Sequence, residues 1–466
     1  MKQATPPSSK FRAFNLRTME ELPGFAALSD DEKFSIRVVS QVFPFRINSY
    51  VASELIDWSR IPDDPIYQLT VPQLGMLRPQ SFKRIADLLR KEAPLEKLRE
   101  TVRSIHAELN PHPAGQATLN VPYLGTERME GVQHKYRETV LFFPQNGQTC
   151  HAYCTFCFRW PQFLTDSEVR FAATDSEPLV RYLELHPEVS DLLITGGDPM
   201  VMSTRALERY LEPLLNADNN GLTTIRIGTK SLAYWPYRYV TDSDADDLMR
   251  LFERIVVSGK HLAIMAHFNH TRELETPIVR TAIARIRGTG AEIRSQSPLV
   301  RHINDVAGVW REMWSTQVNM GIVPYYMFVE RNTGAAHYFS VPLARAWEIY
   351  RAAMMHVSGL SRTVRGPSMS AAPGKVEIQG VAEVHGEKVF VLRMIQGRNA
   401  DWVQRPFFAK FDPDATWLND LQPAFGEREF FYVPEMHARI AAAEAQETVL
   451  AREAELREDE TSFDTA

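Results

Sequence analysis

The chain has 466 residues, of which 44% are hydrophobic and 24% charged, as in an ordinary soluble globular protein. A formal net charge of -6 excludes the basic balance typical of nucleic-acid-binding domains. No apolar run of about 18 residues is present to cross a membrane, and the first residues lack the apolar core of a secretory signal. We therefore expect a cytoplasmic protein with no nucleic-acid or membrane partner.

Residues 1–135 are predicted to form a mainly helical region. Apolar side chains recur with helical spacing at 31–42, 80–92 and 94–108, and proline-rich breaks separate these stretches. No residue pattern in this region points to chemistry. We expect it to act as a scaffold or a cover.

Residues 136–360 alternate short apolar runs with amphipathic segments. A strand every 30–50 residues or so, with a helix between, is typical of the β/α repeat of a parallel sheet. Six such units predict an α/β fold, as an incomplete barrel or an open doubly wound sheet, with functional residues at the carboxyl ends of the strands. The predicted strands are 140–143, 191–197, 223–229, 261–268, 292–297 and 321–328, and the predicted helices 175–187, 203–215, 243–256, 275–287, 305–317 and 341–357.

Residues 361–466 are predicted to form a C-terminal extension that begins in a Gly/Pro/Ser-rich stretch. Two β-like runs at 375–384 and 388–397, joined by His-Gly-Glu, predict a hairpin. The last part of the chain is rich in Ala and Glu, which predicts a terminal helix with a frayed acidic end.

The chain has three cysteines, Cys150, Cys154 and Cys157, and all lie on one short loop after the first predicted strand. A disulfide framework would use an even number spread along the sequence, so the cluster favours soft metal ligands in a reducing compartment. Three thiolates can bind three irons of a [4Fe–4S] cubane and leave the fourth iron open. S-adenosylmethionine (SAM) can chelate that iron, and an electron from the cluster then yields a 5′-deoxyadenosyl radical.

A zinc site is the main alternative for the cysteine loop, with His151 or a distant residue as the fourth ligand. A chance group of core cysteines is another. Zinc sites usually combine two separated ligand pairs, and no second Cys/His pair with suitable spacing occurs in the sequence. We therefore favour the iron–sulfur cluster.

Several segments between about 120 and 375, together with the cysteine loop, resemble the radical SAM superfamily and, within it, the lysine 2,3-aminomutase family. The resemblance implies a divergent member with a partial (β/α)6 TIM-type barrel and isomerase activity. It also implies an electron donor such as flavodoxin or ferredoxin, and a homo-oligomer formed through terminal extensions. The segments are LLITGGDPMVM (192–202), IRIGTK (225–230), AHFNHTREL (266–274), RSQSPLVRHIND (294–305), VPYYMFVE (323–330) and GAAHYF (334–339).

A Gly-Gly-Asp-Pro turn follows the second predicted strand. Its glycines let a ligand approach backbone groups that can bond the amino group of SAM, although an ordinary strand-to-helix turn uses the same residues. The resemblance places SAM against this turn and implies two further neighbours of SAM at the ends of later strands. The implied SAM-binding residues are Gly196, Gly197, Asp198, Pro199, His267 and Gln296.

The family's aminomutases also use pyridoxal 5′-phosphate (PLP), held as an imine by a lysine in a Gly-rich loop. Lys375 matches that lysine, but its loop is about three residues shorter, and a solvated lysine after a turn is the alternative. Lys135 and Arg137 are candidate phosphate ligands. Arg137 is not in register with the family arginine, where Thr139 stands, and a surface pair with Glu138 explains Arg137 equally well.

Arg159 matches the family arginine that binds the substrate α-carboxylate, although it would also balance the charge of the thiolates. Lysine-specific members bind the distal ammonium with two aspartates, which Arg331 and Ala371 replace here. Since an unpaired buried charge is costly, lysine is not expected, and Arg331 favours an acidic distal group. A shift of one residue would bring Glu330 to the pocket and reverse this inference.

Together these features predict a PLP-dependent amino-acid 2,3-aminomutase whose small-molecule substrate is not lysine. An alternative keeps the radical SAM core without PLP and performs dehydrogenation, deamination or epimerisation. A third hypothesis is a non-catalytic zinc or electron-transfer protein.

Overall fold

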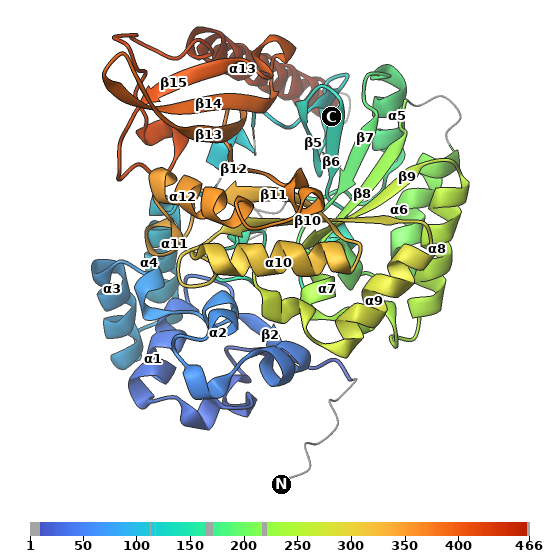
Figure 1. Cartoon of the computed structure of the whole chain (residues 1–466). Coiled ribbons are helices and arrows are strands. Elements are labelled where there is room, and N and C mark those ends of the chain that lie inside the picture. The colour runs from blue at the N-terminus through green and yellow to red at the C-terminus, as the bar shows by residue number, and fades with distance from the viewer. Residues whose placement is uncertain (1–9, 112, 117, 164–170, 217–220, 464–466) are drawn as a thin grey trace.

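The computed structural model describes residues 10–111, 113–116, 118–163, 171–216 and 221–463 (Figure 1). Its centre is an 11-stranded sheet in which every strand lies beside its neighbour in sequence. The strands are β5 (Val132–Tyr136), β6 (Thr139–Phe142), β7 (Asp191–Ile194), β8 (Thr224–Thr229), β9 (His261–His267), β10 (Glu292–Leu299), β11 (Val323–Val329), β12 (Arg365–Ser370), β13 (Gly374–Val384), β14 (Glu387–Gly397) and β15 (Pro406–Lys410).

Strands β6 to β12 are parallel to one another, and β5 and β13 to β15 pair antiparallel at the two ends of the sheet. The six predicted strands are therefore confirmed as β6 to β11. The six predicted helices of this region are confirmed as well. They are α5 (Glu177–Leu185), α6 (Thr204–Asn216), α8 (Ala245–Val257), α9 (Pro277–Gly288), α10 (Ala307–Asn319) and α12 (Leu343–Met354).

Side chains along the strands alternate between two faces of the sheet, one packed in the core and one lining a cavity. On β8, Ile225 and Ile227 are fully buried in the main core, whereas Arg226 and Gly228 line a cavity. Successive side chains of a strand point to opposite faces of the sheet, so one strand serves both purposes. Helices α6, α8, α9 and α10 lie along the outside of the sheet (Figure 1).

The N-terminal region contains the predicted helices as α1 (Asp30–Val39), α3 (Pro79–Arg90) and α4 (Leu95–Glu108). A capping box between Ser29 and Glu32 begins α1. The region also contains strands, since β1 (Ala13–Asn15) pairs antiparallel with β2 (Arg46–Asn48). In the described part of the chain, no helix is long and apolar enough to span a bilayer.

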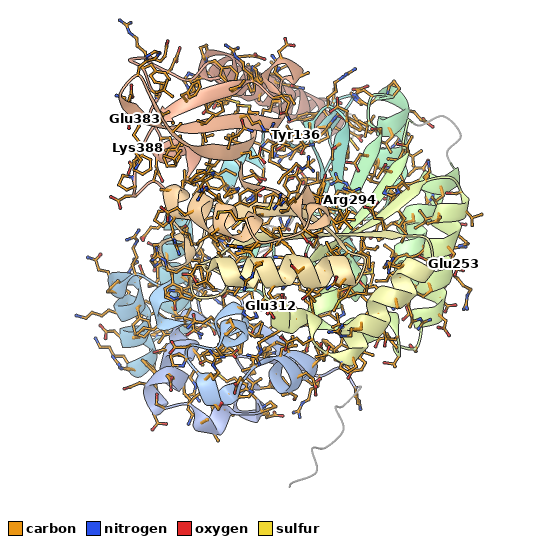
Figure 2. The ribbon with its side chains drawn as sticks, in the orientation of Figure 1. Tyr136, Glu253, Arg294, Glu312, Glu383 and Lys388 are labelled. Atoms are coloured by element: carbon orange, nitrogen blue, oxygen red, sulfur yellow. The ribbon has the colours of Figure 1, made fainter. Side chains whose placement is uncertain are left out.

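The predicted C-terminal hairpin is confirmed as β13 and β14, with His385 and Gly386 at positive φ in the turn. Since β12 pairs with β11, these strands extend the main sheet. Figure 2 shows Tyr136 of β5 beside the C-terminal strands. The terminal helix α13 (Val433–Phe463) continues through the residues expected to fray.

Candidate active site

A cavity of about 330 Å³ lies at the carboxyl ends of the parallel strands. Its lining includes the ends of β7 to β11 and the start of β13. This places side chains from distant parts of the sequence around one space, as expected for a parallel sheet. Of the predicted site residues, the cavity brings together Lys135, Cys150, Cys154, Cys157, Arg159, Gly196, Gly197, His267, Gln296, Arg331 and Lys375.

The cysteine loop is held in place by the N-terminal region. The backbone N–H groups of Tyr153 and Thr155 donate to carbonyls at Arg46 (2.8 Å) and Leu69 (2.9 Å). Asn48, fully buried, donates from Nδ2 to the carbonyl of His151 at 3.1 Å. The N-terminal region therefore does more than cover the sheet, and no pattern in the sequence had marked these residues.

Asn48→Ala is expected to destabilise the protein. The Asn48 side chain also donates to the Tyr234 carbonyl (2.9 Å) and accepts from the Val51 N–H (3.0 Å). Each buried polar group left without a partner costs about 1–3 kcal/mol, so the free energy of unfolding should fall by about 3 kcal/mol or more. Urea unfolding measures this change. The exposed substitution Asn319→Ala is the control, and an equal effect of the two variants would contradict the bracing role.

The Gly-Gly-Asp-Pro turn is joined to the cysteine loop through its backbone. The Asp198 N–H donates to the carbonyls of Gly147 (3.0 Å) and Thr149 (2.7 Å). A Cβ on Gly197 would lie 2.6 Å from the backbone nitrogen of Thr149, so no larger residue fits there without moving the loop. Gly196 has φ +151°, a conformation that favours glycine.

Asp198 and Pro199 are buried behind the two glycines rather than among the residues that line the cavity. The Asp198 carboxylate accepts from the Thr229 hydroxyl (2.6 Å) and from the N–H groups of Met200 (2.9 Å) and Lys230 (2.9 Å). Its side chain thus ties the end of β7 to the end of β8. A direct contact of Asp198 or Pro199 with SAM stays a prediction that the cavity lining does not favour.

The cysteine thiols face the cavity in a desolvated setting. Burial raises the pKa of Cys154 to about 11 and of Cys157 to about 12, so both keep their protons until a metal displaces them. Within the described ranges, no three His, Cys, Asp or Glu side chains are grouped to hold a metal ion. His151, the proposed fourth zinc ligand, does not line the cavity. A cubane spreads its ligands more widely than a single ion does, so three cysteines that line the cavity without forming a compact group suit a cubane better.

His267 and Gln296 meet across neighbouring strands, since Gln296 of β10 pairs with His267 of β9. The His267 Nε2 atom is buried without a hydrogen-bond partner. Burial lowers the pKa of His267 well below its usual value, so the ring is neutral. A buried polar atom with no partner is rare in folded proteins, which suits a ligand that supplies one. The pair fits the predicted SAM side of the cavity.

Lys135 and Lys375 line the cavity from β5 and β13, the strands that pair antiparallel at the two ends of the parallel set. The Lys375 Nζ donates to Gln396 Oε1 at 3.0 Å and lies 4.1 Å from the centre of the Tyr326 ring. Burial, followed by nearby arginines, lowers the pKa of Lys375 well below its ordinary value. The Lys135 Nζ donates to the carbonyl of Ala371, and burial likewise lowers its pKa. Arg137 instead forms a surface pair with Glu138 at 3.8 Å.

Arg159 and Arg331 flank one aromatic ring. Their guanidinium carbons lie 5.1 Å and 4.2 Å from the centre of the Phe158 ring. Burial and then the charge of Arg331 lower the pKa of Arg159 to about 9. In the described part of the chain, no ion pair involves Lys135, Lys375, Arg159 or Arg331. The unpaired guanidinium groups of Arg159 and Arg331 are positive charges that suit anionic ligands.

Glu330 also lines the cavity, beside Arg331. Its side chain is buried, and desolvation raises its pKa well above the usual value. Such a carboxyl group keeps its proton and offers little charge to an ammonium group. The sequence left open whether Glu330 or Arg331 faces the pocket. In the structure both line the cavity, and Arg331 is the one that carries charge.

Lys230 and Tyr234 belong to the site although sequence reasoning passed over them. Lys230 lines the cavity, and its Nζ is held by Glu273 (2.7 Å) and Asn269 (2.9 Å). The Tyr234 hydroxyl lies 3.1 Å from the sulfur of Cys154. Both lie within five residues of the end of β8. Their position just after a predicted strand was the one signal in the sequence that could have marked them.

No family model matches the chain. Relatives found in a comparison of whole sequences are named as lysine 2,3-aminomutases. The chain is 30% identical over 415 residues to a protein of Aquifex aeolicus named "Putative L-lysine 2,3-aminomutase", covering 89% of this chain and 95% of that protein. It is 24% identical to the L-lysine 2,3-aminomutase of Bacillus subtilis, covering 92% and 83%. The corresponding protein of Methanococcus maripaludis is 22% identical, with 92% and 91% covered.

Among solved structures, Streptococcus suis SuiB bound to precursor peptide SuiA aligns with 67% of this chain and 66% of its own. The TM-score is 0.33 and the identity 13%, too low to bear on the fold. The relatives named as aminomutases match nearly the whole chain, and the cavity joins the three cysteines to the other residues of the resemblance. The chain belongs to the lysine 2,3-aminomutase family of radical SAM enzymes, whose members use a [4Fe–4S] cluster and SAM.

Proposed function

We propose that the protein is a PLP-dependent 2,3-aminomutase that acts on an amino acid with an acidic side chain. The observation that carries this proposal is the cavity itself, which is lined by three cysteine thiols and by two arginines, Arg159 and Arg331, that form no ion pair in the described chain. The three thiols suit an iron–sulfur cluster, and the two arginines suit the carboxylates of a substrate. Because the chain belongs to the lysine 2,3-aminomutase family, an aminomutase reaction is the activity that best accounts for these two features.

Cys150, Cys154 and Cys157 would hold the cluster, and Gly196, Gly197, His267 and Gln296 would contact SAM. When bound, these groups supply a carbon radical that removes hydrogen from an unactivated carbon. The protein's own task is to exclude water and to hold the substrate carbon nearby. The buried, largely apolar lining from Phe156 and Met265 serves that exclusion.

Lys375 would hold PLP covalently, and Lys135 would pair with its phosphate. PLP, when bound, supplies a conjugated carrier for the migrating amino group. Lys375 suits this attachment because burial lowers its pKa, which favours the unprotonated, nucleophilic form of the amine. The aromatic side chains of Tyr326 and Phe328 pack beside its amino group, at 4.1 and 5.6 Å from the ring centres.

Arg159 and Arg331 would bind the two carboxylates of the substrate. An arginine meets a carboxylate with two parallel hydrogen bonds and stays charged in a desolvated site. Both guanidinium groups lie over the Phe158 ring, at 5.1 and 4.2 Å from its centre. Ala371 offers no carboxylate for a lysine ammonium, and Glu330 is neutral.

We also infer that the parallel strands form a partial (β/α)6 barrel. Three features favour this arrangement: consecutive strand order, helices along the outside, and a cavity on the inner face. The N-terminal region 1–135 and the extension 361–466 would then close the cavity from two sides. A one-electron donor such as flavodoxin or ferredoxin would reduce the cluster.

The test is an anaerobic assay of the reconstituted protein with SAM, PLP, dithionite and a panel of amino acids. We expect the β-amino isomer of an acidic amino acid, together with 5′-deoxyadenosine, by mass spectrometry. Preferred turnover of lysine would contradict the proposed substrate. An altered substrate with no amino shift and no need for PLP would favour the PLP-independent alternative. No cleavage of SAM with an intact cluster would contradict a radical enzyme.

A further inference from the structure

Tyr234 is a buried tyrosine whose hydroxyl points at the cysteine loop. It ends the short helix α7 (Ser231–Tyr234) after β8 and is 1% exposed. Its hydroxyl oxygen lies 3.1 Å from the sulfur of Cys154. Among the side-chain hydrogen bonds of the described residues, this is the one that reaches a cysteine sulfur.

The direction of this hydrogen bond follows from the chemistry of the loop. A cysteine that ligates iron is a thiolate and has no proton to donate. A phenol keeps its proton near neutral pH. In the loaded protein the Tyr234 hydroxyl is therefore the donor, and the Cys154 sulfur is the acceptor.

Two neighbours fix Tyr234 in this position. The Asn48 side chain donates both to the Tyr234 carbonyl (2.9 Å) and to the His151 carbonyl (3.1 Å), so it joins α7 to the cysteine loop. The Lys230 ammonium lies 4.5 Å from the centre of the Tyr234 ring and is itself anchored by Glu273 at 2.7 Å. A cation over the ring draws electron density from the phenol and strengthens its hydroxyl as a donor.

We propose that Tyr234 is a positioning residue for the cluster, and that its hydrogen bond to the Cys154 thiolate raises the cluster's reduction potential. Hydrogen bonds to cluster sulfurs stabilise the reduced form, which carries one more negative charge, more than the oxidised form. One electron enters the cluster in this step, and no bond is made or broken. The inference rests on the proposed cluster at Cys150, Cys154 and Cys157.

The test is a redox titration of the reconstituted cluster, followed by electron paramagnetic resonance, in the wild type and in Tyr234→Phe. We expect the midpoint potential of Tyr234→Phe to shift to a more negative value. Tyr239→Phe is the matched control, because Tyr239 is equally buried and its hydroxyl bonds to Ser231 at 2.5 Å rather than to a cysteine. Its potential should stay at the wild-type value.

A second substitution protects the test against a variant that loses the cluster. Replacement of Tyr234 by 3-fluorotyrosine keeps the shape of the ring and makes the hydroxyl a stronger donor, so the potential should become more positive. Potentials equal to that of the Tyr239→Phe control in both Tyr234 variants would overturn the inference while leaving the cluster in place. A wild-type protein that forms no redox-active cluster would overturn the proposed function as well.

Discussion

Lys375→Ala should abolish amino-acid isomerisation, with turnover reduced by roughly 1000-fold or more, as for loss of a covalently acting group. The reason is the setting of this side chain. Its amine is buried, has a lowered pKa and is fixed by Gln396 at 3.0 Å, and it is the one lysine of the described chain that lies over the Tyr326 and Phe328 rings. The visible absorbance of lysine-bound PLP should disappear with turnover, while iron content stays at the wild-type level.

Lys388→Ala is the matched control for this loss. Lys388 belongs to the same hairpin and lies next to its turn, at the outer edge of the molecule in Figure 2, and it is not among the residues that line the cavity. Borohydride trapping followed by peptide mass spectrometry should find PLP on Lys375 and not on Lys388. A Lys375→Ala variant that still carries PLP and turns over substrate would contradict the assignment.

The pH dependence of PLP attachment gives an independent readout. Since burial and nearby arginines lower the pKa of Lys375, its amine loses its proton at a lower pH than an exposed lysine does. Trapped PLP on Lys375 should therefore stay high as the pH falls from 9 to 7. A loading curve that declines as for a solvated lysine would show that the amine is protonated in solution.

The fold and half of the site could be predicted from sequence because both depend on local patterns. Strand β8 shows why. The alternation of Ile225 and Ile227 with other side chains predicts a strand from the local sequence alone, without knowledge of the neighbouring strands. The cysteine spacing likewise places three thiols on one loop without reference to the rest of the chain. Local pattern and final structure agree wherever the signal lies within a few residues.

The remaining site residues depend on contacts between distant segments, which no local pattern carries. Asn48 reads as an ordinary polar residue until β2 brings it beside the carbonyl of His151. Tyr234 reads as a core aromatic until α7 places its hydroxyl on Cys154. Asp198 has a role that its motif did not announce, since its carboxylate ties the end of β7 to the end of β8, while its contact with SAM stays a prediction.

Arg331→Met should reduce kcat/KM for an acidic amino acid by roughly 100-fold or more, since removing one partner of a buried charge pair costs about 2–5 kcal/mol. Arg331 lines the cavity together with Arg159, Lys135 and Lys375, and its charge lowers the pKa of all three. SAM cleavage without substrate should be unchanged. Steady-state kinetics with acidic and neutral amino acids measures the effect.

Arg294→Met is the control, because Arg294 lies on β10 outside the cavity lining and pairs with Glu292 at 2.8 Å (Figure 2).

Glu330→Gln separates the two substrate hypotheses. If the substrate is acidic, the neutral Glu330 contributes no charge, and the variant should retain its preference. If lysine is the substrate, Glu330 is the carboxyl at the cavity next to Arg331 that must ionise to bind it, so Glu330→Gln should lose lysine turnover while Arg331→Met gains it. A gain of lysine turnover in Arg331→Met, lost again on adding Glu330→Gln, would overturn the acidic substrate.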